Sequence, residues 1–254
     1  MKSARIIVLL GLAYLTALLI TAPAQIFAQL VAAQSGERIH FAQPQGTIWK
    51  GHAYLQLPGN TTLAALDAGK ITWHIQRLPL LAGKISATLT HNESAPFQLT
   101  LSPSRLHLQH AALTLPGTVV PHLIPTLQAA ALGGNITVRA ENISASESEI
   151  VGELDINWSE VSSSISPVNP LGNYRLSLSG SGSDVKINLQ TVTGSTLIME
   201  GTGSASIQQG VHFEGSARAN DMQSKGLQAQ QLEQVLRLIG NESPPGSGSY
   251  RITI

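Results

Sequence analysis

Residues 174–190 read YRLSLSGSGSDVKINLQ, and the alternation of apolar and polar residues in this stretch decides the fold class. Large apolar residues occupy every second position before and after a Gly/Ser-rich turn at 180–183. Such spacing places the apolar side chains on one face of a strand and the polar side chains on the other. The stretch therefore predicts a β-hairpin in an antiparallel sheet with one apolar face.

The same alternation recurs along most of the chain, in segments bounded by glycine, proline or asparagine. It is clearest at residues 71–75, 85–89, 99–101, 106–108 and 154–158. Two stretches, 118–132 and 226–239, instead carry apolar residues at helical spacing, and each is followed by a glycine. The chain is therefore expected to be mainly β, an elongated and curved antiparallel sheet with two short helices.

The order of these features suggests an approximate internal duplication. Trp73 and Trp158 are each followed by a Pro-Leu pair, several predicted strands, a predicted helix and a last strand. This order predicts two related units, residues 46–140 and 150–254. Chance similarity among β-rich segments is the alternative explanation.

The amino terminus has the pattern of a membrane anchor. Lys2 and Arg5 precede the apolar run IIVLLGLAYLTALLITA at 6–22, and the next cation is Arg38. The length and the charge asymmetry predict a span with its amino terminus in the cytoplasm. We expect a cytoplasmic tip and anchor at 1–24, a linker at 25–45 and a periplasmic β-rich domain at 46–254. A cleaved signal peptide is the alternative, because Ala22 and Ala24 form an A-x-A pattern.

Composition argues against several classes of function. Fifteen basic and fifteen acidic residues balance, so no electrostatic field favours nucleic acid, and the absence of cysteine removes thiolate chemistry and disulfides. The eight histidines are scattered, and His107 and His110 would lie on opposite faces of a strand unless a bulge intervened. The Gly-rich run at 180–184 lies between two predicted strands and is expected to be a turn. We therefore predict no catalytic residues, no metal site, no cofactor and no enzymatic activity.

Four sequence elements stand out as candidate structural motifs. They are GTIWKG at 46–51, WHI at 73–75, LPLLAGK at 78–84 and NPLGNYRL at 169–176. Tryptophan in or beside a strand favours a core role, with partner binding as the alternative for any that is exposed. The candidate residues are Gly46, Trp49, Gly51, Trp73, Pro79, Gly83, Trp158, Asn169, Pro170, Gly172 and Tyr174.

In these elements the chain resembles the type II secretion system protein N family over nearly its whole length. The resemblance implies a single-pass protein of the bacterial inner membrane with its bulk in the periplasm. It implies a non-enzymatic accessory role in exporting folded proteins from the periplasm across the outer membrane, with other inner-membrane or periplasmic secretion components as partners.

A second hypothesis is a membrane-tethered carrier or bridge for lipid or another apolar ligand. A curved sheet leaves open what covers its apolar face, and acyl chains are one physical candidate. The carrier predicts a continuous apolar groove open toward the membrane, whereas the accessory role predicts a packed body without a sizeable pocket.

Overall fold

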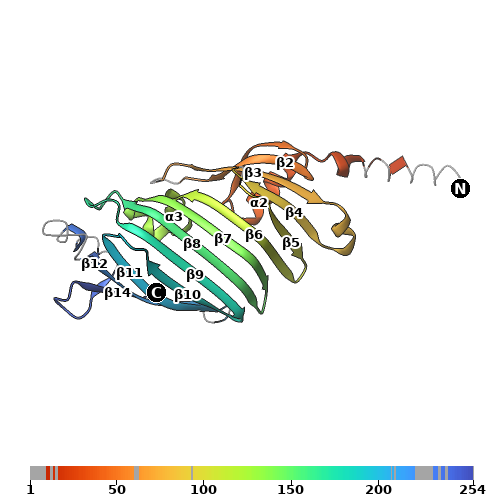
Figure 1. Ribbon diagram of the computed structural model, residues 1–254. Helices are drawn as coiled ribbons and strands as arrows, with labels where there is room; N and C mark the ends of the chain where they lie inside the picture. Colours follow the sequence, from red (N-terminus) through yellow and green to blue (C-terminus); the bar gives the residue numbers. More distant parts are fainter. Residues whose placement is uncertain are drawn as a thin grey trace.

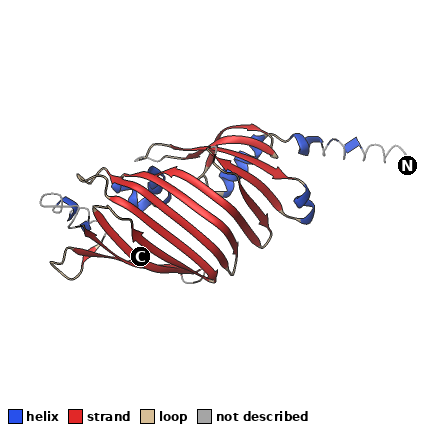
Figure 2. Cartoon of the chain, in the orientation of Figure 1, coloured by secondary structure: helices blue, strands red, loops and turns tan. Residues whose placement is uncertain are grey.

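The computed structural model describes residues 10–11, 14, 17–59, 63–92, 94–206, 208, 210–220, 231–233, 236–237 and 240–253. The part of the chain so described forms one antiparallel sheet, in which almost every strand pairs with its neighbours in sequence. The sheet is long and curved (Figure 1), as the alternating pattern predicted. Figure 2 shows that strands dominate and that helical segments are short.

The first seven strands are β1 (His40–Gly46), β2 (Lys50–Leu57), β3 (Leu66–Gln76), β4 (Ile85–His91), β5 (Phe97–Ser102), β6 (Arg105–Pro116) and β7 (Leu132–Ser146). The others are β8 (Ile150–Ser163), β9 (Gly172–Gly182), β10 (Asp184–Thr191), β11 (Leu197–Ser206), β12 (Gly210–Ala219), β13 (Asn241–Glu242) and β14 (Ser249–Thr253). The last strand of the chain, β14, lies between β12 and β13.

The hairpin predicted at 174–190 is confirmed as β9 and β10. Leu178 pairs with Ile187, and Leu176 pairs with Leu189, so apolar side chains stand opposite one another on the same face. Because the side-chain period of a strand is two residues, a slip of one residue would turn every apolar side chain outward. The alternation in the sequence thus specifies the register.

The segment expected as a linker is instead structured. Residues 25–45 hold most of helix α2 (Ala24–Gln34) and strand β1. Ala24 and Ala28 are buried, and the ring of Phe27 lies 5.0 Å from that of Trp73, centre to centre. The apolar residues that continue past the predicted anchor therefore pack a helix onto the first strands of the sheet.

The predicted helix at 118–132 is wrong in its extent. The chain forms three short pieces there, η2 (Gly117–Val119), α3 (Val120–Leu123) and η3 (Pro125–Ala130), and β7 already begins at Leu132. A proline stands at the start of both α3 and η3, where it can begin a helix but would break one that ran through it.

The second predicted helix, at 226–239, lies mostly outside the described residues. Residues 231–233 and 236–237 are helical, and Leu232 and Leu236 are buried among Tyr174, Leu197 and Tyr250. These leucines cover the apolar face of the last strands.

The described part of the chain holds four apolar clusters, which follow one another along the sheet. They centre on Trp73 with Ala24 and Ala53, on Leu57 with Val119 and Ile136, on Phe97 with Ala111 and Ala140, and on Tyr174 with Leu197, Leu232 and Tyr250. The core is therefore drawn out along one face of the sheet.

Eight of the seventeen residues of the predicted anchor at 6–22 lie outside the described residues. Among the residues that are described, no helix combines the length and apolarity needed to cross a membrane. The domain limits, including the units 46–140 and 150–254, stay predictions.

Candidate interaction surfaces

The first group of motif residues meets where the N-terminal segment joins the sheet. Trp73 is almost fully buried, and its indole nitrogen donates to the carbonyl oxygens of Thr47 at 3.2 Å and Ile48 at 3.1 Å. Gly51 pairs with Trp73 across β2 and β3, and a Cβ on Gly51 would lie 2.6 Å from the Trp73 ring. Glycine at 51 is therefore required by the close approach of the indole.

Trp49 and Arg77 continue this group toward the surface. The indole nitrogen of Trp49 donates to the carbonyl oxygen of Leu19 at 2.8 Å, and the Arg77 guanidinium carbon lies 5.3 Å from the centre of the Trp49 ring. That guanidinium is within reach of a cation–π attraction. A hollow of ≈ 560 Å³ opens beside them, and its lining includes Lys50, His74 and Pro79.

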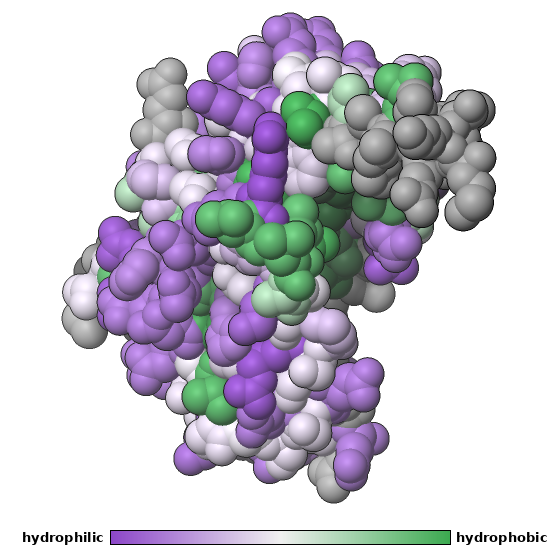
Figure 3. All heavy atoms as spheres, turned by 90° about the vertical axis from the view of Figure 1, so that its right-hand side faces the viewer, coloured by the Kyte–Doolittle hydropathy of each residue, from purple (hydrophilic) through white to green (hydrophobic). Residues whose placement is uncertain are grey.

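The LPLL element forms the short 3₁₀-helix η1 (Leu78–Ala82) between β3 and β4. Gly83 ends it with a φ of 68°. Leu78 is 81% exposed and Leu81 is 89% exposed. Figure 3 shows this end of the molecule, where a group of hydrophobic residues lies at the surface among hydrophilic ones.

The second group of motif residues closes the loop between β8 and β9. The Asn169 side chain accepts from the backbone nitrogen of Ser163 at 2.9 Å and donates to the carbonyls of Ser163 at 3.1 Å and Ser166 at 2.8 Å. The oxygen of Pro170 accepts from the hydroxyl of Thr196 at 2.9 Å. Side-chain bonds of this kind replace the missing ladder bonds of a loop.

Tyr174 lies at the centre of this second group. Its hydroxyl donates to the carbonyl oxygen of Leu197 at 2.9 Å, and burial raises the pKa of that hydroxyl. Gly172 faces the side chain of Ser195, which leaves no room for a Cβ. Ser195, 1% exposed, accepts from the backbone nitrogen of Asn173 at 2.9 Å and donates to the carbonyl oxygen of Val192 at 2.7 Å.

Trp158 pairs with Tyr174 across β8 and β9 and packs against the same cluster. Its indole nitrogen donates to the carbonyl oxygen of Gly133 at 3.0 Å, 25 residues earlier. Trp73 bonds Ile48 at the same sequence separation. Trp73 thus joins β3 to the turn before β2, and Trp158 joins β8 to the start of β7, which is a structural role in both cases.

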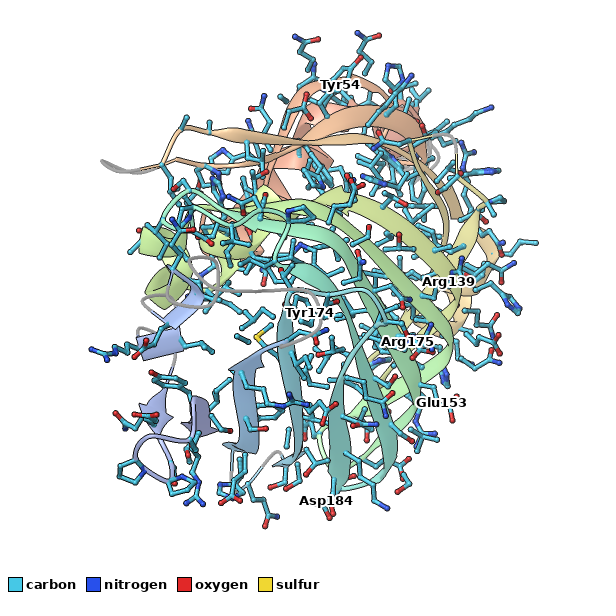
Figure 4. The ribbon with its side chains drawn as sticks, turned by 60° about the vertical axis from the view of Figure 1, so that its left-hand side comes forward. Tyr54, Arg139, Glu153, Tyr174, Arg175 and Asp184 are labelled. Atoms are coloured by element: carbon cyan, nitrogen blue, oxygen red, sulfur yellow. The ribbon has the colours of Figure 1, made fainter. Side chains whose placement is uncertain are left out.

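The two faces of the sheet differ in chemistry. In Figure 4, Tyr174 points into the arch of the sheet, whereas Arg139, Arg175 and Glu153 point away from it. We name these the inner and outer faces. On the outer face, Arg175 donates to Asn157 at 2.9 Å, and the Ser177 hydroxyl donates to Asp155 at 2.7 Å.

The outer face also holds a hollow of ≈ 660 Å³ across β10, β11, β12 and β14. Glu200, Glu214 and Arg251 contribute to its lining, together with Asn188 and Gln190. The hollow suits a polar partner rather than an apolar ligand.

The inner face carries rows of aliphatic side chains that run from strand to strand. Leu99 pairs with Leu108, which pairs with Ile143. Further along, Leu154 pairs with Leu178, which pairs with Ile187. All six side chains are only half-buried. The middle of the inner face is therefore apolar and partly open to solvent.

The described residues contain no group of three or more His, Asp or Glu that could hold a metal ion. His110 in strand β6 has a φ of 53° and stands between the pairs formed by Gln109 and Ala111, whose register with β7 does not shift. This left-handed residue interrupts the regular backbone of β6 between His107 and Ala111. A two-histidine pair alone is a weak metal site.

Sequence reasoning missed several residues of the first group. It did not indicate that Trp73 contacts both Phe27 and Phe41. It also passed over Arg77 and the exposure of Leu78 and Leu81. The only available signal was the unusual Leu-rich turn between two cations, Arg77 and Lys84.

Comparison with known proteins connects most of the chain to a protein family. The family model described as Type II secretion system (T2SS), protein N matches residues 37–253. That range reaches from just before β1 to the last residue of β14. No curated protein and no solved structure matches the chain.

Proposed function

The chain belongs to the type II secretion system protein N family, and from this premise we propose that it is a non-enzymatic accessory component of the secretion machine. In this proposal the N-terminal segment anchors the chain in the inner membrane, and the sheet lies in the periplasm. The sheet supports the export of folded proteins across the outer membrane by contacting other inner-membrane or periplasmic components. The observation that carries the proposal is the family match over the whole sheet.

The polar outer face supports a role in protein contact. Its side chains are held by bonds between neighbouring strands, such as Ser177 to Asp155, so little further ordering is needed when a partner binds. Lys186 and Ser179 pair on this face beside Glu153. Mixed charge along the face favours specific contacts over general adhesion.

Site-specific photocrosslinking in intact cells tests the proposal. Lys186 and Ile187 are neighbours on β10, and their side chains point to opposite faces of the sheet. A photoreactive residue at Lys186 or Gln190 is expected to form adducts with secretion-machine proteins. The matched position Ile187 reports on the inner face in the same protein.

A secretion assay completes the test. Deleting the chain is expected to leave folded substrates of the machine in the periplasm, and the wild-type chain should restore their release. Normal secretion in the deletion strain, together with no machine adducts at Lys186 or Gln190, would contradict the proposal.

The half-buried rows on the inner face favour a second candidate, a carrier or bridge for lipid. Leu178 and Ile187 pair within one such row, and an acyl chain lying across it would complete their burial. Lipid adducts confined to Ile187 and Leu178, with no protein adducts on the outer face, would replace the accessory role with the carrier role.

A further inference from the structure

Among the residues that the structure describes, the most exposed large hydrophobic side chains are those of Leu78 and Leu81 in η1, which we call the leucine tip. They are 81% and 89% exposed. In a 3₁₀-helix, side chains three residues apart eclipse one another, so Leu78 and Leu81 point the same way. Two largely exposed leucines on one side of a turn mark an interaction site rather than scattered surface residues.

The leucine tip is flanked by positive charge. Arg77 precedes it and Lys84 follows it, and between Asp67 and Glu93 the sequence has three cations and no acidic residue. Lys50 and Arg77 also line the hollow beside the tip. An apolar turn with cations on either side of it is complementary to a surface whose outer layer is anionic and whose interior is apolar.

The tip also lies beside the N-terminal apolar segment. Leu19 of that segment accepts the hydrogen bond from Trp49, and Arg77, the residue before Leu78, lies over the same Trp49 ring. Leu18 and Leu19 are 48% and 57% exposed. The exposed leucines of the segment and of the tip are thus joined through one tryptophan at one end of the sheet.

We propose that the leucine tip inserts into the interface of a bilayer that contains anionic phospholipid, while Arg77 and Lys84 lie at the headgroup level. The inference extends the membrane attachment of the proposed function, since it adds a second contact beside the N-terminal segment. Two contacts fix the orientation of the end of the sheet against the membrane, which a single contact cannot do. One short apolar turn binds a bilayer weakly alone, so the cations and the neighbouring segment supply the remainder.

Fluorescence of single-cysteine variants tests this inference, because the native chain has no cysteine. The full-length chain carrying Leu81→Cys is labelled with a polarity-sensitive nitrobenzoxadiazole probe and reconstituted into vesicles. Leu123→Cys is the matched control, since Leu123 is also an exposed leucine of a short helix, α3, which follows the end of β6 and therefore lies at the opposite ends of the strands from η1. Vesicles of phosphatidylethanolamine are compared with and without phosphatidylglycerol, and with brominated lipids as quenchers.

The expected result is a blue shift of the probe at position 81 and its quenching by brominated lipid, both stronger with phosphatidylglycerol. The probe at position 123 should show neither. The double variant Arg77→Gln, Lys84→Gln is expected to lose the phosphatidylglycerol-dependent part of the shift at position 81.

Equal water exposure at positions 81 and 123 in both kinds of vesicle would overturn the inference. The probe at position 81 could instead be shielded from water in native membranes but not in vesicles that hold only lipid and the labelled chain. That result would assign the tip to a protein partner and would also overturn the inference. The vesicles hold no secretion machine, so failure here leaves the proposed secretion role intact. Loss of the secretion role would, in turn, leave the vesicle result standing.

Discussion

The indole nitrogen of Trp49 lies 2.8 Å from the carbonyl oxygen of Leu19, thirty residues earlier in the chain. Two further backbone contacts accompany this bond: Ile48 donates to the carbonyl of Ala22 at 2.9 Å, and Pro23 bridges to Thr47. The N-terminal segment is therefore joined to the first β-hairpin by defined hydrogen bonds, and the GTIWKG motif supplies the residues for them.

Replacing Trp49 with phenylalanine should weaken this junction. The variant keeps an aromatic ring beneath Arg77 but loses the indole donor, which costs about 1 kcal/mol in free energy of unfolding. For a chain of this size the melting temperature should fall by about 2–4 °C, measured on the purified full-length protein in detergent. Tyr54→Phe is the control, because Tyr54 is exposed on the neighbouring strand. Equal melting temperatures for Trp49→Phe and the wild type would show that the bond to Leu19 adds no stability.

Replacing Gly51 with alanine should destabilise the sheet by about 1–3 kcal/mol. The new Cβ would lie 2.5 Å from the carbonyl oxygen of Gln45 and 2.6 Å from the Trp73 ring, and neither group can move freely. Urea unfolding measures the loss. Gly83→Asn is the control, since position 83 has a φ of 68° that asparagine tolerates and open space around it. A Gly51→Ala variant as stable as the wild type would contradict the close approach of Trp73.

Tyr174 should make stability fall at alkaline pH. Burial raises its pKa above the ordinary value of 10.0, so the unfolded chain loses the proton first as the pH rises. The contribution of protonated Tyr174 to the free energy of unfolding is fully present below pH 10. Above pH 10 that contribution decreases by about 1.4 kcal/mol per pH unit. Urea unfolding at pH 9, 10 and 11 should show a steeper decline for the wild type than for Tyr174→Phe. Tyr54→Phe, an exposed position, should decline like the wild type, and parallel curves for Tyr174→Phe and wild type would refute the prediction.

Replacing Asn169 with alanine should loosen the loop between β8 and β9. The variant loses three hydrogen bonds to the backbone of Ser163 and Ser166, and partial exposure limits the cost to about 1–2 kcal/mol. Asn169→Asp keeps the acceptor but loses both donors, so it should be destabilised as well. Hydrogen exchange of residues 163–168 measures the loosening. Unchanged exchange in both variants would mean that the loop is held by packing alone.

The period of two in the sequence was enough to predict the antiparallel sheet, because alternation places the apolar side chains on one face and excludes a slip of one residue, which would turn them outward. Leu178 opposite Ile187 follows directly from that rule. Helix α2 could not be predicted in the same way. Its apolar residues continue the N-terminal run, and only contact with Phe41 and Trp73 distinguishes a packed helix from the end of an anchor.

The candidate residues could be recognised from the sequence, but their contacts could not. The motif glycines and tryptophans were recognised from their types and spacing, and the family they indicated is confirmed by the match over 37–253. Their grouping was not visible, because Trp49 meets Leu19 and Gly172 meets Ser195 only after the chain has folded. The leucine tip could not be predicted either, because the exposure of a leucine depends on which elements surround it in the folded chain.

The sequence by itself determined the fold class, the strand periodicity and the family of this protein, because each depends on local residue order. The tertiary structure alone decided which apolar residues are covered. Trp73 and Leu81 are both large and apolar, yet one is 1% exposed and the other 89%. The difference arises because residues of α2 and β2 pack against Trp73 on β3, whereas no described element covers the turn that carries Leu81.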